Sequence, residues 1–128
     1  MPSHKPADHP AVSPYLLVAD ANAMLAFVVA TFGAQELYRK ARPDGSVMHA
    51  EVRIDDSVLM LGERPERAGA VHGSVHVYVP DVDACYRRGL DAGAASVSPP
   101  TDQAYGDRTA GLRDPQGNLW WIGTHLGG

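Results

Sequence analysis

The feature that most constrains the fold is an internal repeat, because the second half of the chain follows the first at an offset of about 60 residues. Each half opens with an apolar run that ends in an aspartate, at Asp20 and at Asp81. A helical stretch follows and ends in Gly-Ala, at Gly33 and at Gly93. Two further strand-like runs, an acidic turn and a last apolar strand complete each half. The same features in the same order indicate a duplicated supersecondary unit.

Local signals define the elements of each unit. Asp20 and Asp81 suit helix N-caps, because a short carboxylate accepts hydrogen bonds from first-turn N–H groups. Leu25, Val28 and Phe32 form one apolar stripe at helical spacing. We predict helices at about 21–32 and 82–92, and strands at about 12–19, 35–42, 46–55, 58–62, 73–79, 95–98, 106–113 and 118–125. Pro99 and Pro100 are expected in a loop.

The predicted fold class is therefore α+β, with two tandem βαβββ modules that form curled mixed sheets around a cleft. Module 1 covers about 12–64 and module 2 about 72–125, within a single domain at 12–128. The first residues, 1–11, carry charges, histidines and prolines but no apolar signal-peptide core, and they are expected to be a flexible lead-in.

Strand alternation predicts which side chains face the cleft. Val75 and Val77 should lie under the helices, and Ser74, His76 and Tyr78 on the open face. In the last strand, Trp120 and Ile122 should be covered by the helices, while Leu119, Trp121 and Gly123 face the cleft. The repeat places Met60 where module 2 has Trp121, and it places Ser13, Tyr15 and Leu17 where module 2 has Ser74, His76 and Tyr78.

Composition excludes some classes of function. The 128 residues hold 11 Lys and Arg against 15 Asp and Glu, a formal charge of −4, which argues against a nucleic-acid partner. No apolar run is long enough to span a membrane. Cys85 is the only cysteine, so no internal disulfide can form and a cytoplasmic location is expected.

Two segments carry a resemblance to a known family. One is Val18-Ala19-Asp20 leading into the helix that ends at Gly33, and the other is the ending Tyr105-Gly106-Asp107-Arg108 with Arg113-Asp114-Pro115-Gln116-Gly117-Asn118-Leu119-Trp120-Trp121-Ile122. Together they resemble the vicinal oxygen chelate superfamily, which includes glyoxalase I, extradiol dioxygenases and bleomycin-resistance proteins. The ending looks closest to the PhnB-like or resistance-protein branch. The resemblance implies the curled two-module fold and, in small members, a homodimer.

The same resemblance implies four metal-ligand positions in the metal-dependent members. In this sequence they are Ser13, Met60, Ser74 and Trp121. A thioether, an indole and two neutral hydroxyls are poor donors for Ni, Zn or Fe. We therefore expect no metal and no other cofactor.

The candidate ligand-binding residues share the predicted open face or its rim: Tyr15, Met60, Ser74, His76, Tyr78, Tyr105 and Trp121. Flat rings and an adaptable thioether suit a planar apolar ligand, although the same residues could pack against a second subunit. His76 is the one candidate acid–base residue, with a satisfied structural histidine as the alternative. His49 and Glu51 alternate on the third strand and are expected to form a solvated, charge-paired edge rather than a displaced metal site. Arg108 either meets an anionic ligand group or pairs with Asp107 or Asp102.

The sequence thus predicts a metal-independent protein that sequesters a planar, partly aromatic small molecule and forms a homodimer. An alternative is a lyase, isomerase or dioxygenase-like enzyme that uses a non-standard metal site or His76 as a base. A third is an interaction module whose cleft serves only dimerisation.

Overall fold

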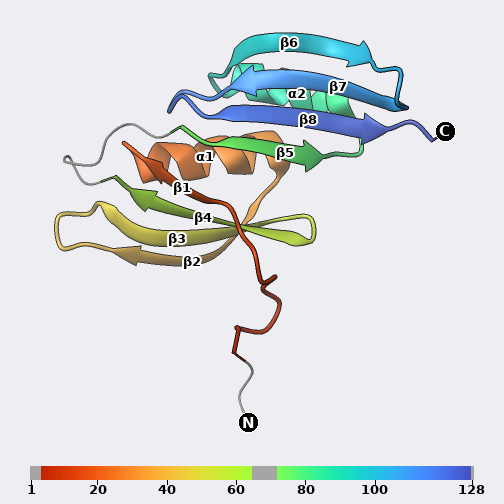
Figure 1. The fold of residues 1–128 in the computed structure, drawn as a ribbon. Helices are drawn as coiled ribbons and strands as arrows, with labels where there is room; N and C mark the ends of the chain where they lie inside the picture. Colours follow the sequence, from red (N-terminus) through yellow and green to blue (C-terminus); the bar gives the residue numbers. More distant parts are fainter. Residues whose placement is uncertain (1–3, 65–71, 128) are drawn as a thin grey trace.

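The structure is a computed structural model that describes residues 4–64 and 72–127. The elements of module 1 are β1 (Tyr15–Val18), α1 (Ala21–Phe32), β2 (Gln35–Ala41), β3 (Val47–Ile54) and β4 (Ser57–Glu63). Those of module 2 are β5 (Ser74–Tyr78), α2 (Val82–Asp91), β6 (Ala95–Asp102), β7 (Asp107–Arg113) and β8 (Leu119–His125). The order βαβββ occurs twice, so the predicted fold class is confirmed (Figure 1).

Each module forms its own four-stranded mixed sheet. Sheet A has the order β1-β4-β3-β2, and sheet B has the order β5-β8-β7-β6. The first and last strands of each module pair in parallel, with Tyr15 opposite Met60 and His76 opposite Trp121. These are the pairs that the repeat makes equivalent, so the duplication extends to the strand register.

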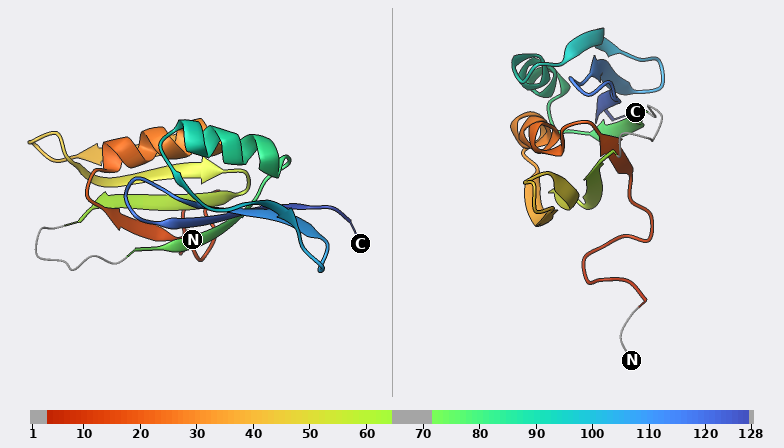
Figure 2. Two further views of the ribbon diagram at one scale, coloured as in Figure 1. Left: turned by 90° about the horizontal axis from the view of Figure 1, so that it is seen from above. Right: turned by 90° about the vertical axis from the view of Figure 1, so that its left-hand side faces the viewer.

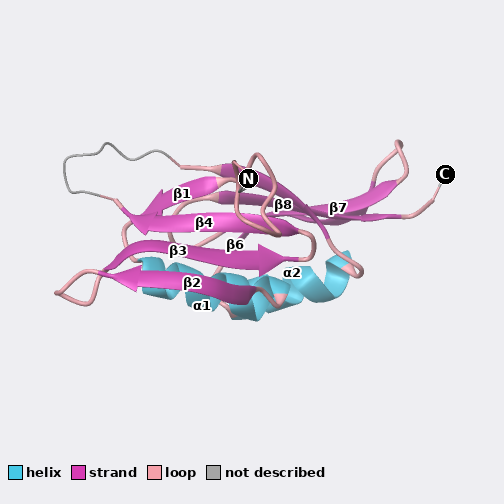
Figure 3. Cartoon of the chain, turned by 90° about the horizontal axis from the view of Figure 1, so that it is seen from below, coloured by secondary structure: helices cyan, strands magenta, loops and turns pink. Residues whose placement is uncertain are grey.

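The two modules lie side by side with both helices on one side of the sheets (Figures 2 and 3). The strands β1 and β5 are edge strands, and these two edges lie nearest each other (Figures 1 and 2). Neither sheet closes on itself. The sheets therefore share one open side, opposite the helices.

The hydrophobic core fills the helix side, as the alternation predicts. Trp120 and Ile122 are fully buried, and the ring of Trp120 lies 5.0 Å from that of Phe32 and 6.5 Å from that of Phe27. Trp121, the next residue along β8, is 38% exposed. Burying a side chain the size of Trp120 contributes several kcal/mol, roughly 25 cal/mol for each Å² of apolar surface, so the alternation along β8 is strongly enforced.

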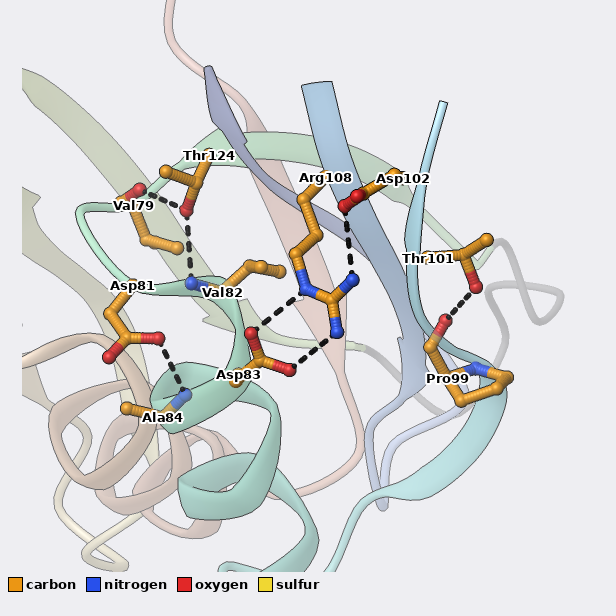
Figure 4. A network of polar contacts seen from close by, with 10 residues as sticks. All are labelled: Val79, Asp81, Val82, Asp83, Ala84, Pro99, Thr101, Asp102, Arg108 and Thr124. Atoms are coloured by element: carbon orange, nitrogen blue, oxygen red, sulfur yellow. Dashed lines mark hydrogen bonds and ion pairs between the residues drawn. The ribbon is translucent and has the colours of Figure 1, made fainter. Parts of the chain in front are cut away.

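The predicted helix caps are confirmed. The Asp20 side chain accepts from Ala23 N at 3.0 Å, and that of Asp81 accepts from Ala84 N at 3.1 Å (Figure 4). Gly33 ends α1 with φ 66°, a left-handed conformation that glycine adopts without a steric penalty.

Two strand boundaries differ from the prediction by more than one residue. The strand β1 begins at Tyr15 rather than at residue 12. The strand β6 runs on to Asp102, so Pro99 and Pro100 lie inside a strand rather than in a loop. β6 is an edge strand that pairs only with β7, and its register shifts between Ser98 and Thr101. Prolines are tolerated there, because their missing N–H is not needed for a second neighbour.

A buried aspartate organises the turn between β7 and β8. Asp114 is 3% exposed, and its Oδ2 accepts from Trp120 Nε1 at 2.7 Å. Its Oδ1 accepts from Gln116 N at 2.8 Å and from Asn118 N at 3.1 Å. The carboxylate thus joins the turn to the largest side chain of the core.

A second polar network ties α2 to sheet B (Figure 4). Arg108 Nε and Nη2 donate to the two carboxylate oxygens of Asp83 at 2.9 and 3.1 Å, and Nη1 donates to Asp102 at 3.0 Å. These bonds raise the pKa of Arg108 above its ordinary value. Thr124 Oγ1 accepts from Val82 N and donates to Val79 O.

Among the elements of the described ranges, no helix is long and apolar enough to cross a membrane.

Candidate functional site

On the open face of sheet B, the Trp121 ring lies between Ser74 of β5 and Gly111 of β7. Its Nε1 donates to Ser74 Oγ on β5 at 3.1 Å, at one end of the indole. At the other end, a Cβ added to Gly111 on β7 would lie 2.7 Å from Trp121 Cζ3. The indole therefore extends across β8 from one neighbouring strand to the other, and only a glycine at position 111 leaves room for it.

A cavity of about 370 Å³ lies beside the free edge of β5. His76 and Tyr78 form part of its wall, with ring centroids 4.7 Å apart in a T-shaped contact. The remaining wall comes from the segment before β1, the β3–β4 turn, β5 and Trp120: Val12, Pro14, Ile54, Asp55, Asp56, Ser57, Val58, Leu59, Val75, Val77 and Trp120. The volume falls in the range of small-molecule sites.

A buried carboxylate connects Tyr78 to His125. Asp107 is 4% exposed; its Oδ2 accepts from the Tyr78 hydroxyl at 2.7 Å, and its Oδ1 lies 2.8 Å from His125 Nδ1. The bond from His125 and then the bond from Tyr78 hold the pKa of the Asp107 carboxyl below its ordinary value. The bond to Asp107 raises the pKa of Tyr78 in turn. Tyr78 and His125 also line a second cavity, of about 660 Å³.

Sheet A carries a different polar cluster on its open face. His49 Nε2 lies 2.9 Å from Glu51 Oε2, and His9 Nε2 lies 2.6 Å from Glu51 Oε1. Hydrogen bonds from His9 and His49 hold the pKa of Glu51 below its ordinary value. The ring of Tyr15 lies 5.6 Å from that of His49. The cluster is charge-paired, as the sequence analysis favoured, but it is not a solvated edge, because β3 lies between β4 and β2 and the Glu51 side chain is only 16% exposed beneath His9 of the lead-in.

The seven predicted site residues do not form one group. His76 and Tyr78 line the smaller cavity, and Trp121 lies next to His76 in the strand register. Ser74 holds the Trp121 ring. Tyr15 and Met60 are register partners on the neighbouring strands β1 and β4 of sheet A. Tyr105 is 68% exposed in the β6–β7 turn. The structure thus brings together the residues of module 2 and leaves those of module 1 and Tyr105 apart from the cavities.

Sequence reasoning missed two residues of this region, Asp107 and His125. A signal for His125 was available, because it follows Trp121 and Gly123 at the same strand spacing and so lies on the same face. No local pattern marks Asp107 as its partner, since the two meet only through the pairing of β7 with β8.

The four positions that the resemblance assigns to a metal do not fit one. Ser74 and Trp121 bond to each other, Met60 offers only a thioether, and Ser13 Oγ is buried with no hydrogen-bond partner among the described residues. Within residues 4–64 and 72–127, no group of three or more His, Cys, Asp or Glu side chains is placed to hold a metal ion. Divalent transition metals need imidazole, thiolate or carboxylate donors, which these four positions lack.

A family model described as the Glyoxalase/Bleomycin resistance protein/Dioxygenase superfamily matches residues 7–122. The chain is 38% identical over 125 residues to the uncharacterized protein Mb0911c of Mycobacterium bovis, an alignment that covers 89% of this chain and 82% of that protein. An uncharacterized protein of Mycobacterium tuberculosis, Rv0887c, is also 38% identical over 125 residues, with 74% of its length covered.

Solved structures share the fold. The crystal structure of TioX from Micromonospora sp. ML1 aligns with a TM-score of 0.74 at 26% identity, covering 93% of this chain and 98% of that one. The fosfomycin resistance protein FosX from Mesorhizobium loti aligns with a TM-score of 0.68 at 18% identity, covering 93% and 92%. At 18% identity the likeness to FosX shows the fold alone.

Proposed function

Since the chain belongs to the Glyoxalase/Bleomycin resistance protein/Dioxygenase superfamily, we propose that it sequesters a planar, partly aromatic small molecule without using a metal ion. The observation that carries the proposal is the 370 Å³ cavity, with His76 and Tyr78 among the residues of its wall. Sites for small molecules are commonly concave and apolar with a few polar groups, and this cavity has that character. Among the proteins that share this fold, FosX is a fosfomycin resistance protein.

Trp121 extends the proposed site from the cavity onto the open face. It is the register partner of His76, and it is 38% exposed although indoles are usually well buried. Its ring is held by Ser74 at one end and fits over Gly111 at the other, so a ligand ring can stack on it without first ordering it.

The experiment is a thermal-shift screen of planar aromatic compounds, followed by fluorescence titration of each hit. Both tryptophans can respond to a bound ligand, because Trp120 lies in the cavity wall and Trp121 on the open face, so repeating the titration in Trp121→Ala isolates the signal of Trp121. Trp121→Ala should weaken binding by about tenfold or more once lost burial is included. Tyr38→Ala is the matched control, because Tyr38 is 50% exposed on sheet A, away from both cavities. A hit whose affinity survives Trp121→Ala but falls with Tyr38→Ala would contradict the proposed site.

We further propose that the protein is a homodimer. Large side chains on the open side stay exposed in the single chain, including Tyr15 at 49%, Leu17 at 40% and Tyr78 at 59%. Exposed apolar patches of this kind usually mark an interface. Small-angle scattering at micromolar concentration should give twice the chain mass of 13.7 kDa, and a monomer mass would refute the proposal.

A further inference from the structure

His125 is held by a carboxylate in one orientation. Its Nδ1 lies 2.8 Å from Asp107 Oδ1, and Asp107 is ionised because two hydrogen bonds hold its pKa below the ordinary value. A carboxylate can only accept, so the proton of the neutral imidazole must sit on Nδ1. The lone pair then sits on Nε2, and the His125 side chain is 62% exposed. The geometry therefore fixes the ring with Nε2 as its free acceptor atom, open to a hydroxyl group of a ligand.

The cavity next to His125 suits an apolar ring with one polar group. It measures about 660 Å³, and its apolar wall contains Phe32, Ile54, Val79 and Pro80. Ile54, Asp55 and Tyr78 line both this cavity and the smaller one, so the two cavities are neighbours. The larger cavity, which is lined by Tyr78 and His125, is therefore the place where a ligand of the proposed class would meet His125.

The charges around the larger cavity restrict the class of ligand further. Asp55 in the β3–β4 turn lines both cavities, and Asp107 lies behind His125. The other titratable groups near Asp107 are Tyr78, which bonds to it, and His76, which lies within its field. Two carboxylates disfavour a ligand that carries a permanent negative charge, such as a phosphate. A neutral ligand with a weakly acidic hydroxyl meets no such repulsion when it binds. If its proton passes to Nε2, the new anion lies beside the imidazolium, whose positive charge offsets the carboxylates.

We propose that His125 accepts the proton of a phenolic or enolic hydroxyl on the bound ligand, with Asp107 as its positioning residue. The ligand O–H bond breaks, the proton bonds to Nε2, and the electron pair stays on the ligand oxygen as phenolate or enolate. The total charge is unchanged. The inference rests on the proposed function, since it names the class of ligand that the same site takes.

His125 fits this role better than His76, the residue that the sequence marked. In the described part of the chain His76 contacts the ring of Tyr78 but has no hydrogen bond to a carboxylate. An imidazole without such a partner has neither a fixed tautomer nor a counter-charge for its protonated form.

The test uses 4-nitrophenol, because its absorption spectrum reports whether the bound molecule is phenol or phenolate. Wild-type protein should bind it and increase the phenolate band at a pH where the free compound is mostly neutral. His125→Gln should lose that band. Its affinity for nitrophenol should fall by up to about tenfold, because a charge-assisted hydrogen bond is removed. His72→Gln, an exposed histidine at the start of module 2, is the control and should behave like the wild type.

The outcomes separate the two proposals. Binding of neutral nitrophenol, or a phenolate band that persists in His125→Gln, would overturn the inference and leave the proposed function intact. So would a protein that binds other planar aromatics but not nitrophenol. A protein that binds no planar aromatic at all would overturn both.

A ligand-free measurement tests the positioning residue. Nitrogen-15 NMR of the imidazole should show the Nδ1–H tautomer for His125 in the wild-type protein. Asp107→Asn should lose that preference even where the melting temperature shows that the variant is folded. An Nε2–H tautomer in the wild type would refute the inference without any ligand.

Discussion

Replacing Asp114 with alanine should remove a large part of the stability of this protein. The carboxylate accepts three hydrogen bonds, from Trp120 Nε1 and from the backbone amides of Gln116 and Asn118. Trp120 and Asn118 are almost completely inaccessible, so water cannot replace the lost acceptor for their N–H groups without opening the core.

The magnitude follows from these three donors. Each buried donor left without a partner costs about 1–3 kcal/mol. Two such donors, with the Gln116 amide at the turn able to reach solvent, give a loss of roughly 4 kcal/mol. That is a large fraction of the roughly 5–15 kcal/mol by which a domain of this kind is typically stable. The melting temperature should fall by roughly 15 °C.

Chemical and thermal unfolding, followed by circular dichroism, measure the loss. Asp114→Asn should cost less, because one oxygen remains for the backbone amides while an NH₂ group faces Trp120 Nε1. In a Trp120→Phe background the further cost of Asp114→Asn should shrink, since the indole donor is gone. Asp102→Ala is the control, because its side chain is 68% exposed and its ion pair is worth about 0–1 kcal/mol. A loss below about 1 kcal/mol for Asp114→Ala would refute the reasoning.

Three further outcomes are expected. The pKa of His9 is raised by its bonds to Ala7 O and then Glu51, and the pKa of Glu51 is lowered, so this contact should be strongest between about pH 4.5 and 6.5. Protection of the amides in residues 4–11, measured relative to intrinsic exchange at each pH, should therefore fall as the pH rises through the pKa of His9, and Glu51→Gln should remove that protection at every pH. Gly111→Ala should displace the Trp121 ring, because the new Cβ would lie 2.7 Å from it; the tryptophan emission should change while Tyr38→Ala leaves it unchanged. Added Ni or Zn should leave the melting temperature unchanged, since an ion that binds only the native state would raise it.

The fold could be predicted from the sequence because its strongest signals are local and occur twice. Asp20 and Asp81 mark the helix starts, and the alternation along β8 separates Trp120 from Trp121. The end of β6 could not be predicted in the same way. Pro99 and Pro100 are usually turn residues, and only their position on the edge of sheet B allows them to continue a strand.

The site was less predictable, because its contacts depend on which strands become neighbours. The open face and its His76, Tyr78 and Trp121 followed from alternation alone. The bond from His125 to Asp107 depends on the β7–β8 register, and the bond from His9 to Glu51 joins residues of the lead-in and β3. Distances of this kind are set by tertiary structure and leave no pattern within one strand.

Every strand ladder of the described chain stays within one module. The modules meet through side-chain packing, of α1 on α2 and of Phe27 and Phe32 on Trp120, rather than through a shared sheet. The strands of one module can therefore pair before those of the other module have formed. The loop that each ladder closes lies within about half of the chain, which limits the entropy lost on closing it. Folding by this route would form two half-domains and then dock them. Substitutions at the α1–α2 contact should then accelerate unfolding more than they slow the formation of either sheet.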